Sequence, residues 1–414
     1  MAELVPDDAG TSRGTPRFWT AVVRRRKHAL LLGAVFWALM LWRVVSEGGR
    51  FTRDALPVGW DFHIFRSAGA LVASGQAAKL YDPAALSRAA KAALPGDYPV
   101  FPYLNPPHFA AACAPLSALP FPLAFGLVTL LSLALLAFAL RILLRESGAN
   151  GARPWPAFAY ALASYPVILG LFAGQICFLS LWLLATAAAS ALRGRALLSG
   201  LLVGALAYKP QLTVGFLLLF TLDRSLRWRA LAGFSLSAAL SLVACVLVSA
   251  EASREYVLSL GQLIDVQARF RLALSVTGRA FFEQLLPSLS GLASALGAAL
   301  GLACAIAFGS WARHEKRLKL RLAGALWLTL AAAPHASMYE WTLLLVPLAL
   351  LHGELDEQRF TLLAAILFLV SYVAPPLAEA MTDRFGFGVH LAFPALLATG
   401  WYAVRTLPAP LPRT

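Results

Sequence analysis

Long apolar segments limit what this chain can fold into more than any other feature of its sequence. Three of them, at 29–45, 121–144 and 231–250, are close to the roughly 20 residues that cross the hydrocarbon core of a bilayer. Of the 414 residues, 59% are hydrophobic and only 14% are charged, which is more apolar than the core of a soluble domain requires. The sequence therefore predicts an all-α polytopic integral membrane protein. It excludes a secreted enzyme, a nucleotide-fold enzyme and a disordered regulator.

Similar segments recur along the chain and set its predicted topology. An even number of spans places both termini on the cytoplasmic side, where 22 of the 35 Lys and Arg residues then lie. The net charge of +14 is explained in this way by membrane orientation rather than by nucleic-acid binding. The twelve predicted spans are about 29–45, 121–144, 155–172, 175–192, 196–208, 210–222, 230–250, 290–312, 321–334, 339–352, 360–376 and 389–405.

The predicted domain organisation is simple. A basic cytoplasmic tail at 1–28 precedes one transmembrane domain at 29–405, and a short cytoplasmic tail follows at 406–414. The first apolar segment lacks a small-residue cleavage site, which favours an uncleaved signal anchor.

Two long outer loops interrupt the predicted spans, at 46–120 and 251–289. The first loop contains the proline-containing stretch 106–119, which is too short to cross upright, so we expect a re-entrant or interfacial helix there. If it crossed, every later loop would change sides. The length and charge of the second loop suggest a lid.

Several familiar chemical signatures are missing. Cys113, Cys177, Cys245 and Cys304 are far apart in apolar segments, which supports neither a disulfide nor a metal site. The sequence has no phosphate-binding P-loop, no D-x-D pair and no H-E-x-x-H. The energy for any reaction must therefore come from the substrate or from a gradient.

Polar residues gather at the outer ends of the predicted spans. Gln175, Lys209 and His335 lie there, and Asp61 lies early in the first outer loop on the same side. Ionisable groups beside apolar segments often mark function. Asp61 has two interpretations, as a cap for a following helix or as a general base in an apolar cleft.

The cationic residues are also open to two interpretations. Lys209 is either a snorkelling lysine or a ligand for a lipid-linked phosphate. His335 is either structural or functional, since it lies just before Tyr339 and Glu340. Four arginines either add contacts to the phosphate or are solvated surface charges, namely Arg66, Arg269, Arg271 and Arg279.

Short motifs follow one another in a fixed order along the chain. They are Trp60 to Phe65, Gly75, Leu80 to Pro83, Asn105 to Pro107, Ala114 to Pro120, Ala173 to Gln175, Tyr208 to Pro210, and His335 with Tyr339. This ordered set resembles glycosyltransferase family 87, and the resemblance covers about residues 28–405. Phe65 departs from the family pattern at a position where tyrosine is expected, and Asn105 replaces the tyrosine of Tyr-Pro-Pro.

This family is similar to polyprenyl-phosphate-mannose-dependent mannosyltransferases of the C-type membrane fold. The resemblance implies an inverting enzyme of the bacterial inner membrane with its active site on the periplasmic face. A sugar, mannose by resemblance, would pass from a polyprenyl-phosphate donor to a hydroxyl of a glycolipid or glycan.

The resemblance also assigns roles to residues. It implies that Asp61 is the general base and that Lys209 and His335, with Arg279 added from its charge, bind the donor phosphate. No cofactor, metal or nucleic acid is expected, although Asp82 and Asp97 leave a cation in the first loop open. Residues expected to contact substrate are His63, Arg66, Tyr81, Asn105, Gln175, Tyr339 and Glu340.

Two other classes of function compete with this interpretation. A transporter or flippase of lipid-linked sugars would also need many spans, but its polar residues should lie near the membrane midplane rather than at one face. A polymerase or ligase of surface glycans would share the lipid-phosphate substrates, but it gives the Asp61 motif no role.

Overall fold

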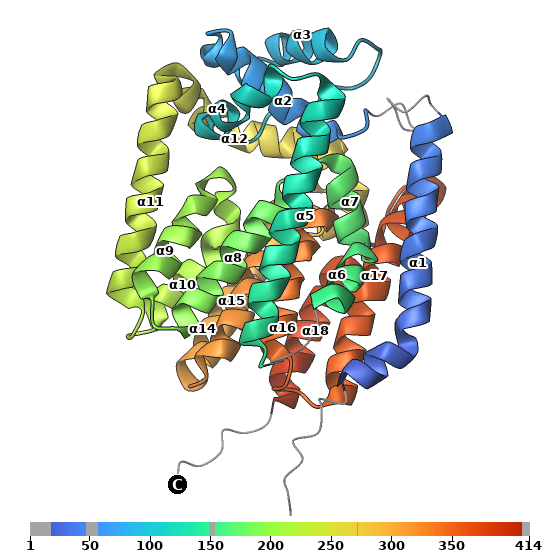
Figure 1. The fold of residues 1–414 in the computed structure, drawn as a ribbon, viewed down its shortest axis with the longest axis vertical. Coiled ribbons are helices and arrows are strands. Elements are labelled where there is room, and N and C mark those ends of the chain that lie inside the picture. Colours follow the sequence, from blue (N-terminus) through green and yellow to red (C-terminus); the bar gives the residue numbers. More distant parts are fainter. Residues whose placement is uncertain (1–17, 47–56, 149–153, 271, 408–414) are drawn as a thin grey trace, which may run out of the picture.

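The computed structural model describes residues 18–46, 57–148, 154–270 and 272–407, and within these ranges it is helical apart from two isolated β-bridges (Figure 1). The longer helices are α1 (Phe18–Ser46), α2 (Trp60–Ala73), α3 (Pro83–Ala93), α4 (Pro107–Ser117), α5 (Phe121–Glu146), α6 (Pro154–Leu162), α7 (Tyr165–Ala173), α8 (Cys177–Leu192), α9 (Ala196–Gly204), α10 (Val214–Leu222), α11 (Arg227–Val248), α12 (Ala250–Phe270), α13 (Gly278–Leu285), α14 (Ser290–His314), α15 (Leu318–Ala332), α16 (Leu345–Leu351), α17 (Glu357–Phe385) and α18 (Ala392–Thr406). The 3-10 turns are η1 (Ala77–Lys79), η2 (Ala205–Tyr208), η3 (Pro210–Thr213), η4 (Leu272–Leu274) and η5 (Met338–Leu344).

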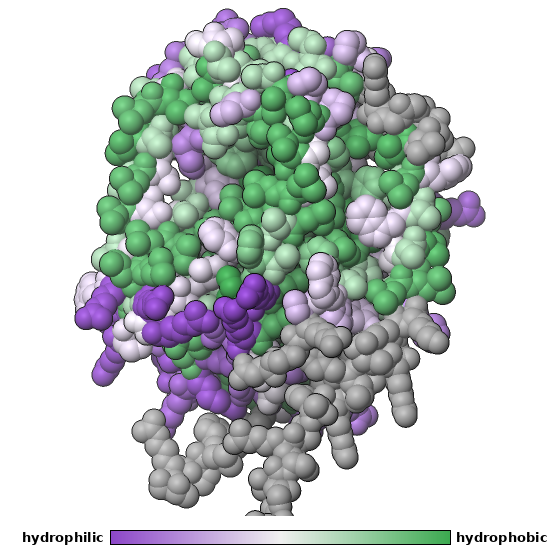
Figure 2. All heavy atoms as spheres, viewed as in Figure 1, coloured by the Kyte–Doolittle hydropathy of each residue, from purple (hydrophilic) through white to green (hydrophobic). Residues whose placement is uncertain are grey.

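The chain is a multi-pass membrane protein. Among the described residues, α5, α11, α14 and α17 are long and apolar enough to cross a bilayer, and the bent pair α6 and α7 would make a fifth span. Figure 2 shows the matching surface, in which apolar side chains dominate the middle of the molecule and hydrophilic ones gather toward its two ends. Shorter apolar helices occupy most of the other predicted spans, and the number twelve stays a prediction.

One predicted span is broken. The segment 155–172 forms two helices, α6 and α7, that meet at an angle of 71°. Ser164 is extended between them, and Pro166 lies in the first turn of α7. Proline lacks the N–H that would continue the hydrogen bonds of α6, so a new helix begins there.

Helices that do not cross the membrane cover one end of the bundle. In Figure 1, α2, α3, α4 and α12 gather at the top, whereas α1 begins and α18 ends at the bottom. With its 11 residues, α4 is only about 16 Å long, so it cannot cross a bilayer. Arg193, Arg224 and Arg313 are exposed, the first two just after α8 and α10 and the third in the last turn of α14.

The centre of the bundle is α8, whose Cys177, Phe178, Leu181 and Leu184 are completely buried. It packs against α5, α9 and η5. A helix so enclosed holds the neighbouring segments in fixed positions, and the polar loop just before its first turn carries Gln175.

Candidate active site

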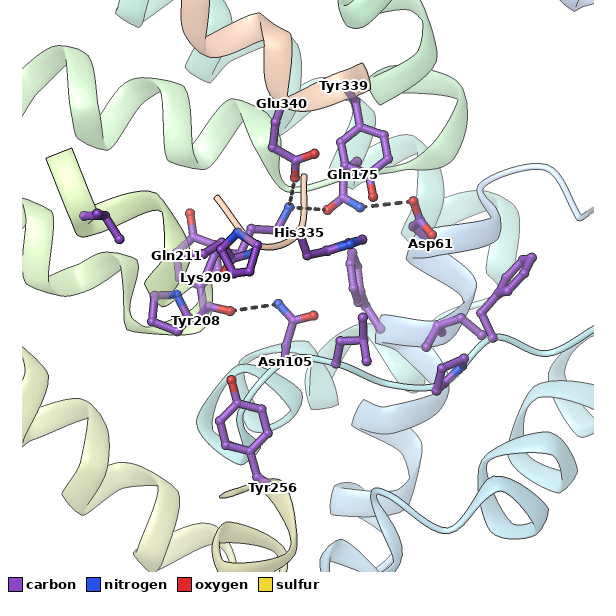
Figure 3. A pocket seen from close by; sticks show the side chains of 18 residues that line it. Asp61, Asn105, Gln175, Tyr208, Lys209, Gln211, Tyr256, His335, Tyr339 and Glu340 are labelled. Carbon is purple, nitrogen blue, oxygen red and sulfur yellow. Dashed lines mark hydrogen bonds and ion pairs between the residues drawn. The ribbon is translucent and has the colours of Figure 1, made fainter. Parts of the chain in front are cut away.

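A cavity of about 290 Å³ lies between the covering helices and the end of the bundle that they cover (Figure 3). Its lining comes from α2, the loop before α4, the loop before α8, the η2–η3 turn with the start of α10, α12, and η5 with the segment before it. The residues predicted from sequence that line it are Asp61, Asn105, Gln175, Lys209, His335, Tyr339 and Glu340.

Two glycines bring Asp61 and Gln175 together. Gly59 precedes α2 at φ 68° and donates its N–H to the carbonyl of Phe172 at 2.9 Å. Gly174 ends α7 at φ 64°, and a Cβ atom there would lie 2.5 Å from the Cβ of Phe62. Glycine alone tolerates both the left-handed backbone and the close approach. The start of α2 is therefore fixed against the end of α7.

Asp61 lies in the first turn of α2 rather than at its cap. The cap position is Gly59, and no side chain caps this helix, so the capping role considered for Asp61 is not what the structure shows. The carboxylate is 7% exposed and accepts a hydrogen bond of 3.0 Å from Nε2 of Gln175. Its negative charge is also favourable near the positive end of the helix dipole.

The orientation of the Gln175 amide follows from its neighbours. Its Oε1 accepts from the Nζ of Lys209 at 3.2 Å and from the backbone N–H of Ile176 at 2.9 Å. Both neighbours can only donate, so the Nε2 of Gln175 must face Asp61. An amide donor in this position favours an accepting carboxylate oxygen, as a general base requires.

Lys209 owes its position to the residue that follows it. Proline disfavours helical conformation in the preceding residue, and Lys209 accordingly has φ −138° and ψ 68° between η2 and η3. The break turns the side chain into the cavity, where Nζ lies 2.6 Å from Oε1 of Glu340 and 5.4 Å from the ring centre of Tyr339. The lysine is 8% exposed.

Glu340 completes the chain of polar contacts. It occupies the third position of a capping box, in which its Oε2 accepts from the backbone N–H of Ser337 at 2.8 Å. The same carboxylate therefore orders the start of η5 and binds Lys209. Figure 3 shows the resulting line of contacts from Glu340 through Lys209 and Gln175 to Asp61.

His335 contributes little positive charge to this cavity near neutral pH. Burial, together with the charges of Lys209 and Arg279, lowers the pKa of His335 to about 4. The imidazole is therefore neutral near pH 7, and Lys209 carries the positive charge of the lining. Two carboxylates, Asp61 and Glu340, line the same cavity.

Asn105 anchors the segment before α4 to the turn that carries Lys209. The side-chain Nδ2 of Asn105 donates to the backbone carbonyl of Tyr208 at 3.2 Å. The backbone carbonyl of Asn105 accepts from the hydroxyl of Tyr81 at 2.8 Å. The hydroxyls of Tyr208 and Ser180 are 2.9 Å apart. Tyr81 thus holds Asn105 in position but does not itself line the cavity.

Three other predicted residues also lie behind the cavity. The Nε2 of His63 is 2.9 Å from the hydroxyl of Tyr98, and Arg66 donates to the carbonyls of Ser117 and Leu119 at the end of α4. Arg279 forms an ion pair with Glu283 on α13. Arg271 lies outside the described residues, as does the side chain of Arg269.

Some lining residues were not predicted as site residues. Gln211 lies two positions after Lys209, and Tyr256 reaches the cavity from α12. The sequence shows that α12 is amphipathic, but the face that meets the cavity depends on how the helix docks. Among the described residues, no three His, Cys, Asp or Glu side chains are grouped to hold a metal ion.

The family model of glycosyltransferase family 87 matches residues 103–337. The chain belongs to glycosyltransferase family 87. The match spans more than half of the sequence and includes Asn105, Gln175, Lys209 and His335, while Asp61 precedes it. No curated protein and no solved structure matches the chain. Membership makes the protein a glycosyltransferase, and the cavity is its candidate active site.

Proposed function

We propose that the protein transfers a sugar from a polyprenyl-phosphate donor to a hydroxyl group of a glycolipid or glycan, with inversion at the anomeric carbon. Asp61 is the general base and Lys209 binds the donor phosphate. The observation that carries this proposal is the Gln175 amide, which holds a buried carboxylate and a buried ammonium group on opposite sides of itself in one cavity.

The chemistry needs both groups. The acceptor hydroxyl loses a proton as it attacks, and the carboxylate of Asp61 can take it. The bond between the anomeric carbon and the phosphate oxygen breaks at the same time, and negative charge grows on the phosphate. A cation beside that phosphate stabilises the transition state in a site of low dielectric constant.

Lys209 has one N–H donor left with which to bind the phosphate. An ammonium group has three N–H donors, and the contacts to Gln175 and Glu340 use two of them. Within the described part of the chain, no acceptor pairs with the third. Neutral His335 can add a hydrogen bond to the phosphate without adding charge.

Membrane orientation follows from charge. The basic residues of the lower end favour the cytoplasmic side, which would place the cavity on the periplasmic side of the bacterial inner membrane. A lipid-linked donor suits that side because nucleotide sugars are not available there. We retain twelve spans, the C-type fold and one domain over 29–405 as part of this proposal.

The test is transfer of labelled mannose from a short-chain polyprenyl-phosphate mannose to a membrane-lipid extract. Wild type should turn over, and Asp61→Asn should be about 100-fold to 10,000-fold slower with donor binding retained. Asp82→Asn is a matched control, because Asp82 only caps α3.

The other outcomes are equally informative. Full activity in Asp61→Asn would remove that residue as the base. Lipid movement across vesicles without any sugar transfer would favour the transporter instead.

A further inference from the structure

Two sides of the active-site cavity differ in charge. One side carries the contacts that join Glu340 to Asp61. The other side is formed by Tyr256 and by residues of the segment 101–105, none of which is charged. In Figure 3, Asn105 and Tyr256 lie below the dashed line of contacts. We propose that Asn105 and Tyr256 bind hydroxyl groups of the donor sugar and decide which sugar is transferred. This inference rests on the proposed function, because it takes the charged side as the place of reaction.

The charged side fixes where the sugar ring lies. In a displacement with inversion, the acceptor hydroxyl and the phosphate are on opposite faces of the anomeric carbon. With the hydroxyl at Asp61 and the phosphate at Lys209, that carbon lies between them, in front of the Gln175 amide that connects the two. The amide oxygen of Gln175 already accepts two hydrogen bonds, and its Nε2 donates to Asp61. The sugar ring therefore extends toward the uncharged side.

The two residues lie at the phosphate end of the cavity rather than at the acceptor end. The Nδ2 of Asn105 donates to the carbonyl of Tyr208, the residue just before Lys209. In Figure 3, Tyr256 also lies toward Tyr208, whereas Asp61 lies at the other end of the cavity. The acceptor approaches from Asp61, on the far face of the anomeric carbon. Groups beside the turn that carries Lys209 therefore meet the donor sugar and not the acceptor.

Both residues have hydrogen-bonding capacity left for a sugar. Within the described part of the chain, no group bonds to the Oδ1 of Asn105 or to the hydroxyl of Tyr256. Burial raises the pKa of Tyr256 to about 12, so the hydroxyl keeps its proton near pH 7. An amide oxygen accepts, and a phenol both donates and accepts. Together they match sugar hydroxyls, each of which can also do both.

A row of three tyrosines holds the uncharged side in place. The ring centre of Tyr81 lies 5.7 Å from that of Tyr256 and 5.9 Å from that of Tyr103. The hydroxyls of Tyr81 and Tyr103 donate to the backbone carbonyls of Asn105 at 2.8 Å and Pro106 at 3.2 Å. The row thus fixes α12 against the segment before α4. Selection between epimers needs such fixed positions, because epimers differ only in the direction of one hydroxyl.

Binding of two ligands tests the assignment without requiring transfer. The full chain in detergent is titrated with a short-chain polyprenyl-phosphate mannose and with the same polyprenyl phosphate without sugar. Tyr256→Phe, which removes only the hydroxyl, should weaken binding of the first ligand by about 3-fold to 10-fold and leave binding of the second unchanged. Tyr402→Phe, on α18 outside the lining, is the matched control and should equal wild type. An equal loss for both ligands, or no loss, would overturn the proposal.

Donors that lack one sugar hydroxyl at a time identify the contact made by each residue. For wild type, kcat/KM should fall by about 3-fold to 10-fold when the hydroxyl bound by Tyr256 is missing. In Tyr256→Phe the same deletion should cause no further loss, and Asn105→Ala should behave likewise with a different hydroxyl. A mere loss of the anchor between Asn105 and Tyr208 would instead slow transfer from every donor equally. Equal losses with every deoxy donor would contradict the proposal.

A further measurement separates this inference from the proposed function. If wild type binds neither polyprenyl ligand, the proposed donor is wrong. Saturation-transfer NMR with methyl mannoside, methyl glucoside and methyl galactoside then tests the uncharged side by itself. Saturation transfer to one of these glycosides in wild type, and its loss in Tyr256→Phe, would keep the assignment. Identical spectra for the two proteins would overturn it.

Discussion

The Nζ of Lys209 lies 2.6 Å from the Oε1 of Glu340, so the cation that we assign to the donor phosphate is one half of a buried ion pair. The pair keeps the lysine from being an isolated charge in an apolar setting. It also means that a phosphate must share the ammonium group with a carboxylate. Binding of an anion here depends on the third N–H of Lys209 rather than on displacement of Glu340.

Breaking this pair should cost stability as well as binding. Lys209→Met or Glu340→Gln leaves one buried charge without its partner, and each should lower the free energy of unfolding by about 3–5 kcal/mol. The double variant should regain much of that stability but still bind the donor poorly. Thermal unfolding in detergent and donor titration measure the two quantities, and a double variant with normal donor affinity would contradict the role of Lys209.

Gln175 is expected to act on the rate more than on donor affinity. Gln175→Leu removes the donor to Asp61, and a hydrogen bond to a charged group contributes about 1.5–3 kcal/mol. We expect kcat to fall by roughly 10-fold to 100-fold, with a smaller change in KM. Gln76→Leu, at an exposed position, is the control. A change confined to KM would show that Gln175 serves binding alone.

The glycine contact between α2 and α7 gives a prediction with an internal control. Gly174→Ala should place a methyl group against Phe62, which displaces Asp61 from Gln175 and lowers both stability and activity. Gly75→Ala has a similar φ of 72° but open space around it, so only the backbone penalty of about 1 kcal/mol applies. Equal activity losses in the two variants would exclude the packing explanation.

Acid should destabilise the fold through two buried histidines. Burial lowers the pKa of His63 to about 4, as it does for His335. As pH falls from about 6.5 toward 4, the unfolded chain takes up protons that the folded chain does not, so stability decreases in this window and levels off below it. Unfolding temperatures at pH 7 and pH 5 measure the decline.

Substitution identifies the residues responsible for that decline. The combined variant His63→Gln with His335→Gln should show a smaller decline than wild type, whereas His28→Gln, at an exposed position, should match wild type. An unchanged decline in the combined variant would assign it to other groups.

The topology predicted from the sequence already placed several of the site residues on one side of the membrane. Gln175, Lys209 and His335 lie at predicted span ends and Asp61 in the outer loop on the same side, and segments on the same side of a bundle can share one cavity. The break at Lys209 was also readable, because Pro210 follows it. The family match supports the same conclusion about activity, as it rests on a long ordered stretch of the chain.

Other features depend on tertiary packing and had no clear local signal. The contact of Lys209 with Glu340 joins residues 131 positions apart, and the face of α12 that presents Tyr256 depends on docking. The break between α6 and α7 did have a signal, the Ser164 to Pro166 sequence. The prediction of one continuous span at 155–172 followed the apolar character of the whole segment and gave the proline too little weight.

The wide separation of the site residues along the chain has a consequence for biosynthesis. Lys209 enters the membrane long before its partner, because Glu340 lies in the last fifth of the 414 residues. Until η5 is inserted, the ammonium group has no carboxylate beside it, and its flexible stem should keep it at the water interface. Insertion of η5 would then draw the lysine inward, so the active site would be assembled late, by one of the last segments of the chain to be made.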